Sequence, residues 1–113
     1  MWTDLDVVED GVPLRGTDGG ILVVDQVHDL GARISLERND DSSHHIITCG
    51  IYEWMMHSRY LSVGEDEARA EFTAMREALD GIIARIPNRS DPDVDRRTAA
   101  SGDEMSAFAE RFP

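Results

Sequence analysis

Four histidines and a single cysteine are the residues of this sequence with the widest range of chemistry. His44 and His45 are adjacent, so in a strand their side chains would point to opposite faces and would not share one ion easily. His45 and Cys49 would share a face, but about 13 Å of strand would separate them, which is too far for two ligands of one metal. We therefore predict no metal site and no cofactor, with the histidine pair exposed beside a polar turn.

Patterns for nucleophilic catalysis and for calcium binding also fail on their spacing. Cys49 lies in a predicted strand of an acidic chain, whereas a reactive thiol needs a base and an electropositive setting, so we expect a small buried hydrophobic residue. Residues 91–95 begin like an EF-hand loop, but its sixth position is Arg96 instead of glycine and its twelfth is Gly102 instead of glutamate. We predict no catalytic residue, and a protein that is more plausibly not an enzyme.

The mid-chain segment 52–60 is the richest candidate for a site, because it gathers aromatic, methionine and arginine side chains. These residue types are enriched at binding hot spots, although the same cluster could simply be core. A tryptophan at a hairpin tip is hard to bury within its own domain. The interface that we predict consists of Tyr52, Trp54, Met55, His57 and Arg59.

The turn of this hairpin decides which side chains face the core. We place the turn at residues 53–54, between strands over residues 44–52 and 55–61. Closure there sets Ile51 opposite Met56 and Ile47 opposite Tyr60. The expectation is then that Ile51 and Met56 point inward while residues 52, 54 and 55 lie on the other face.

The net charge of −12 comes from 23 acidic residues and 11 arginines, with no lysine. The charge is spread along the chain, at −4 over residues 1–19, −3 over 20–62, −3 over 63–86 and −2 over 87–113. Such a field repels a nucleic-acid backbone and an anionic membrane, so we expect neither as a direct partner. Arginine without lysine is typical of codon bias in a GC-rich genome, which indicates a bacterial protein.

Cellular location follows from similar observations. The longest purely apolar run is Ile21 to Val24, whereas a transmembrane helix needs about twenty residues. The N-terminus is acidic where a signal peptide would be basic and then apolar. A single cysteine allows no intrachain disulfide, so we expect a cytoplasmic protein.

Three functions fit these observations. The first is a non-enzymatic protein–protein interaction module that forms a homodimer through the outer face of its sheet. The second is an acidic inhibitor, of the immunity or anti-defence type, of a basic nucleic-acid-binding protein, because electrostatic steering would speed that association. The third is a small enzyme or ligand-binding pocket between helix and sheet that uses His44 or His57 as an acid–base group.

The elements that must position these residues predict an α+β fold. Strands at residues 21–28, 32–38, 44–52 and 55–61 make an antiparallel four-stranded β-meander, and Val12–Leu14 is a candidate for an extra short N-terminal edge strand. In the second strand of the meander, apolar residues 32, 34 and 36 alternate with polar ones, which is typical of a sheet with one wet face.

One amphipathic helix over residues 65–86 packs on this sheet in our prediction. Its apolar side chains recur every three or four residues, and Ser62 with Glu65 matches a capping box. Residues 101–113 predict a short C-terminal helix that forms only if it docks. The expected organisation is an irregular N-terminal arm at 1–20, a ββββα domain at 21–86, a linker at 87–100, and a short C-terminal helix or tail at 101–113.

Overall fold

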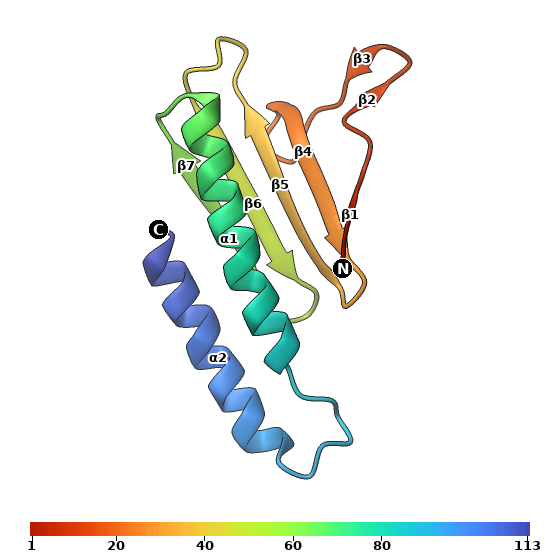
Figure 1. Cartoon of the computed structure of the whole chain (residues 1–113), viewed down its shortest axis with the longest axis vertical. Helices are drawn as coiled ribbons and strands as arrows, with labels where there is room; N and C mark the ends of the chain where they lie inside the picture. Colours follow the sequence, from red (N-terminus) through yellow and green to blue (C-terminus); the bar gives the residue numbers. More distant parts are fainter.

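The computed structural model describes all residues from 1 to 113 as an α+β fold in two layers, with both helices on one face of a sheet (Figure 1). The five-stranded antiparallel sheet has the order β1-β4-β5-β6-β7, with β1 at Trp2–Asp4, β4 at Ile21–His28, β5 at Ala32–Arg38, β6 at His45–Ile51 and β7 at Met55–Leu61. A separate two-stranded sheet pairs β2 (Val8–Glu9) with β3 (Val12–Pro13). The helices are α1, Glu65–Arg85, and α2, Val94–Arg111.

The predicted meander corresponds to β4 through β7, and the sheet has a fifth strand that the sequence pattern did not place. The candidate edge strand at Val12–Leu14 pairs instead within the arm, as β3 against β2. The edge position beside β4 belongs to β1, where Trp2 lies opposite His28. Trp2 holds this strand in place, because its indole Nε1 donates a hydrogen bond of 2.6 Å to Asp80 on α1.

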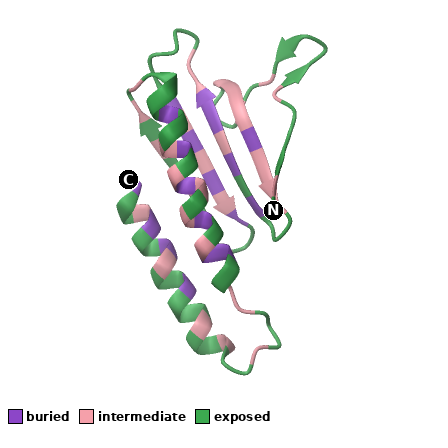
Figure 2. Ribbon diagram, viewed as in Figure 1, coloured by how far each residue is buried: buried purple, intermediate pink, exposed green.

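The core lies between the sheet and the two helices, and in Figure 2 the residues coloured as buried lie on the strands and helices of both layers. The apolar residues predicted for the inner side of β5 are buried, and so is the apolar stripe of α1. The core cluster consists of Ala32, Ile34, Leu36, Ile47, Cys49, Ile51, Ala68, Phe72, Met75, Leu79, Ile82, Ile83, Met105, Phe108 and Phe112.

Helix α1 occupies the predicted segment, but the capping box at its start is wrong. The N-cap is Gly64, which offers no side-chain hydrogen bond, and Ser62 lies two residues further back in an exposed position. Glu65 is therefore the first helical residue instead of the third, so it is not at the position from which a capping box reaches back. Acidic residues still fill the first turn, where the helix dipole favours them.

Helix α2 is longer than predicted, because it begins at Val94 and not near Ser101. Ser101 is a buried residue in the middle of the helix, and half of the predicted linker, residues 94–100, is helical. The helix docks on its own domain, where Arg85 Nε donates a 2.6 Å hydrogen bond to Glu104 and Phe108 joins the core. Neither helix of the structure is long and apolar enough to cross a membrane.

Candidate protein-interaction surface

The β6–β7 hairpin closes through the loop of residues 52–54, one residue longer than the turn predicted at 53–54. The Trp54 N–H donates to the Ile51 carbonyl at 2.8 Å, and Glu53 adopts a positive φ of 66°. Ile51 consequently lies opposite Met55, and not opposite Met56 as predicted. A shift of one residue moves every side chain of a strand to the other face, so the predicted faces of β7 are reversed.

Three large apolar side chains stand free of the core as a result. Tyr52 is 77% exposed, Met56 is 81% exposed and Tyr60 is 67% exposed. Met56 lies opposite Gly50 and Tyr60 opposite Ile46, on the side of the sheet away from the helices. We call Tyr52, Met56 and Tyr60 the outer patch.

Of the five residues in the predicted interface, the structure brings only Tyr52 into the outer patch. Trp54 and Met55 are half-buried and pack against the core. His57 and Arg59 lie on the inner face, where the His57 Nε2 donates to the carbonyl oxygen of Phe112, the residue that caps the end of α2. The sequence prediction missed Met56 and Tyr60, whose exposure depends on the length of the turn.

Arg59 is held on the inner face by contacts with both helices. Its Nη1 donates a 2.6 Å hydrogen bond to Glu71 of α1, and its guanidinium lies 5.5 Å from the ring centre of Phe112. The side chain is only 15% exposed. This arginine therefore contributes to the docking of the helices and has little area left for a partner.

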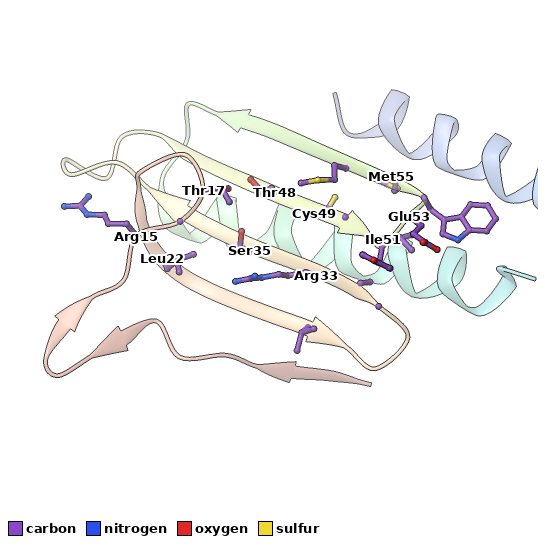
Figure 3. A pocket seen from close by; sticks show the side chains of 18 residues that line it. Arg15, Thr17, Leu22, Arg33, Ser35, Thr48, Cys49, Ile51, Glu53 and Met55 are labelled. Atoms are coloured by element: carbon purple, nitrogen blue, oxygen red, sulfur yellow. The ribbon is translucent and has the colours of Figure 1, made fainter. Parts of the chain in front are cut away.

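A groove of about 740 Å³ crosses the outer face between the N-terminal arm and the hairpin tip (Figure 3). Side chains of Leu22, Val27 and Met56 line it together with Ser35 and Thr48 of the central strands. Its volume is in the usual range for ligand pockets, about 300–1,000 Å³, but its lining is mostly apolar and it is open to solvent.

Arg33 is the charged residue nearest the middle of this groove, and an acidic neighbour already holds it. Its guanidinium donates to both carboxylate oxygens of Asp25, at 2.9 and 2.5 Å. The hydrogen bond to Asp25 raises the pKa of Arg33, so this cation stays charged and paired. The pair leaves no free charge in the middle of the groove for a ligand.

The N-terminal arm covers one end of the outer face at Glu37. This carboxylate is fully buried, and its Oε1 accepts a 3.0 Å hydrogen bond from the Gly20 N–H. Burial raises the pKa of Glu37, since desolvation penalises its charged form. A Cβ at Gly16 would lie 2.1 Å from the Glu37 Cδ, so a larger residue there would have to displace the Glu37 side chain.

The adjacent histidines lie on opposite faces, as predicted, but only His44 is exposed. The His44 Nδ1 is 2.8 Å from the Ser43 Oγ, which donates its proton to Asp41 at 2.6 Å. In a catalytic triad the serine hydroxyl donates its hydrogen bond to the histidine. Here the Ser43 hydroxyl donates to Asp41 instead, so His44 does not activate it as a nucleophile. His45 is fully buried, with its Nδ1 donating to the Val63 carbonyl at 2.9 Å.

Cys49 is a buried core residue, as expected, and burial raises the pKa of its thiol to about 12. A thiol with such a pKa has almost no thiolate at neutral pH and is a poor nucleophile. No group of three or more His, Cys, Asp and Glu side chains lies close enough together to hold a metal ion.

Comparison with known proteins gives no family for this chain. No protein-family model matches it, and neither does any curated protein or solved structure.

Proposed function

We propose that the chain is a non-enzymatic protein–protein interaction module that works through the outer face of its sheet, with a second copy of the chain as its partner. The main support is that both helices cover the same face of the sheet. The opposite face is left with the outer patch, whose three side chains are between 67 and 81% exposed. Single exposed apolar residues are common on monomers, but a cluster beside an open apolar groove is typical of an interaction site.

The chemistry of the groove supports a binding role over a catalytic one. Its titratable side chains are Arg15, Arg33, Glu53, Cys49 and Tyr52. Arg33 is paired with Asp25, and the raised pKa of the Cys49 thiol disfavours a nucleophilic role. General acid–base catalysis needs a group poised to exchange a proton near neutral pH, and no histidine lines this groove. The one cysteine is a free, buried thiol, which is compatible with a cytoplasmic location.

Size-exclusion chromatography with light scattering tests the proposal over roughly a hundredfold range of concentration. We expect a mass that rises from 12.6 kDa towards twice that value. The double variant Met56→Ser/Tyr60→Ser removes two side chains of the outer patch and should stay monomeric with an unchanged circular dichroism spectrum.

Val12→Ser is the matched control, because Val12 is an apolar residue of the arm that is 64% exposed and lies outside the outer patch. This variant should associate like the wild type. A wild-type chain that is monomeric at the highest concentration reached would contradict the proposal. A double variant that associates as strongly as the wild type would contradict it as well.

A further inference from the structure

We infer that the two copies join edge to edge: β7 of one copy pairs antiparallel with β7 of the other about a two-fold axis at Ser58. The two five-stranded sheets then form one continuous sheet. This inference rests on the proposed function and specifies the geometry of the self-association. Four observations on β7 lead to it.

The first observation is a set of backbone groups on β7 that have no partner. The Tyr52 N–H, directly after β6, donates to the Gly31 carbonyl on the β5 side at 2.8 Å. Consecutive strand residues direct their N–H and C=O groups to opposite neighbours, so residue 51 and every second residue before it are directed at β7. The odd-numbered residues of β7, which lie opposite them, are therefore the ones whose backbone groups face β6. Met56, Ser58 and Tyr60 therefore direct their backbone groups away from β6, where no backbone hydrogen bond outside the ladders reaches them.

The second observation is that this edge has little of the usual protection against strand pairing: an inward-pointing charge, Arg59, is its one such feature. Edge strands are commonly blunted by proline, lysine, a bulge or an exposed charge. Strand β7 has seven residues in continuous register with β6, with no proline, lysine or acidic residue. Its one arginine, Arg59, is turned inward and bound to Glu71. The opposite edge of the sheet, β1, is only three residues long and includes Asp4.

The third observation is that the strand is complementary to itself. A two-fold axis at Ser58 places Met56 opposite Tyr60 of the second copy, and Tyr60 opposite Met56 of the second copy. These side chains point to the outer face, where each is more than 60% exposed in the single chain. Aromatic and aliphatic side chains in directly opposed positions are favourable cross-strand pairs. The seam would thus bury the two most exposed apolar side chains of β7 against each other.

The fourth observation concerns charge. Two copies of a chain with a net charge of −12 repel each other unless they meet where acidic residues are sparse. Glu53 is the only acidic residue between positions 44 and 64, although the whole chain has 23. Approach along β7 therefore brings together the two segments of the chain that are poorest in acidic residues.

Cysteine cross-linking tests this geometry directly. Ser58→Cys would place two thiols at the two-fold axis, on residues whose Cα atoms are about 5.5 Å apart in a hydrogen-bonded antiparallel pair. A disulfide spans that separation. We expect this variant to oxidise to a covalent dimer, while the native Cys49 does not react because it is buried.

Thr48→Cys is the matched control, since Thr48 lies directly opposite Ser58 on β6 and on the same face. It is one strand away from the seam, so edge pairing keeps its thiols too far apart to join. Cross-linking at position 58 without cross-linking at position 48 is the expected result.

Ser58→Pro gives a second, independent test. The N–H lost from position 58 is directed away from β6, so proline there removes a bond that only the second copy would make. We expect a folded monomer by circular dichroism and light scattering. A folded dimer of Ser58→Pro would contradict edge pairing.

The possible outcomes separate this inference from the proposed function. A dimer that cross-links at position 48 alone, or at neither position, overturns edge pairing but leaves the interaction module intact, with the sheets stacked face to face or joined elsewhere. A wild type that is monomeric at all concentrations overturns both.

Discussion

Ile51 and Met55 lie directly opposite each other across the β6–β7 hairpin, and this pairing decides which side chains of β7 reach solvent. Met55 accompanies Ile51 towards the core, so Met56 must point to the outer face. The positive φ of Glu53 allows the loop to hold three residues, 52 to 54, between the paired positions. One residue of loop length thus creates the outer patch.

The two adjacent methionines provide a test of this register. Met55→Ser should lower the free energy of unfolding by about 1–2 kcal/mol, because it removes a half-buried side chain that packs against the core. Met56→Ser should change it by less than about 0.5 kcal/mol, because that side chain is exposed. Urea unfolding at a concentration where the wild type is monomeric measures both. The reverse order of the two effects would mean that the hairpin has the register with Ile51 opposite Met56.

Much of the sheet could be predicted because its strands are marked by local signals. The strands predicted at residues 21–28, 32–38 and 55–61 agree with β4, β5 and β7. Alternating apolar and polar residues mark β5, and Gly31 adopts the positive φ that its turn requires. The apolar stripe of α1 is likewise a local pattern of helical period.

The missing parts of the prediction depend on contacts between distant residues. Residues 94–100 have a polar composition like that of a linker, yet they are helical because the rest of α2 docks through Met105 and Phe108. Trp2 is fixed at the sheet edge by Asp80, which is far away in the sequence. Contacts between residues so far apart in the sequence leave no local sequence pattern that could predict them.

The outer patch could be found only in part, for a similar reason. The residue types of segment 52–60 point to this hairpin, and Tyr52 belongs both to the predicted interface and to the outer patch. Met56 and Tyr60 were missed because the sequence does not fix whether Trp54 belongs to the turn or precedes it. The burial of Glu37 had no sequence signal, since its cover comes from Gly16 and Gly20 of the arm.

The docking of α2 predicts a large effect of Phe108. This side chain is 4% exposed and packs edge-on against His57, with ring centres 6.1 Å apart. Phe108→Ala should reduce the free energy of unfolding by about 3–4 kcal/mol. The helical circular dichroism signal should also fall, since most of the stability of a helix in a protein comes from the packing of its apolar face.

Ser106 is the control for this experiment, because it is exposed on the same helix. Ser106→Ala should leave the free energy of unfolding within about 0.5 kcal/mol of the wild type. Equal stability of Phe108→Ala and the wild type would indicate that α2 does not contribute to the core.

The buried carboxylate of Glu37 predicts a specific pH dependence. Its pKa is raised by burial in the folded state, so the folded chain holds this proton to higher pH than the unfolded chain does. The contribution of Glu37 to stability therefore falls as the pH rises from the ordinary value of 4.5 through the raised value. Glu37→Gln keeps an oxygen for the Gly20 N–H but has no proton to lose in this range.

Urea unfolding at a series of pH values measures this effect as the difference between the variant and the wild type. We expect Glu37→Gln to gain stability relative to the wild type as the pH rises from about 4 to 7. Glu53→Gln is the control, since Glu53 is exposed in the hairpin loop, and its difference from the wild type should stay flat. A flat difference for Glu37→Gln as well would mean that the carboxylate is solvated and the arm does not cover it.

The Asp25–Arg33 pair predicts an asymmetry between its two partners. Asp25 is 3% exposed while the Arg33 side chain is 63% exposed. Arg33→Ala leaves a buried carboxylate without its cation and should cost about 2 kcal/mol, less than a fully buried pair would because water screens the exposed arginine. Asp25→Ala leaves a cation that water can solvate and should cost about 1 kcal/mol.

A double-mutant cycle completes this test by urea unfolding. The double variant should be more stable than Arg33→Ala alone, because removing Asp25 also removes the unpaired buried charge. The exposed pair Arg15–Asp40, at 3.1 Å, is the control, and Arg15→Ala should change stability by less than about 0.5 kcal/mol. If Asp25→Ala cost more than Arg33→Ala, the packing of Asp25 would outweigh its charge, and the groove floor would depend on shape instead of on this ion pair.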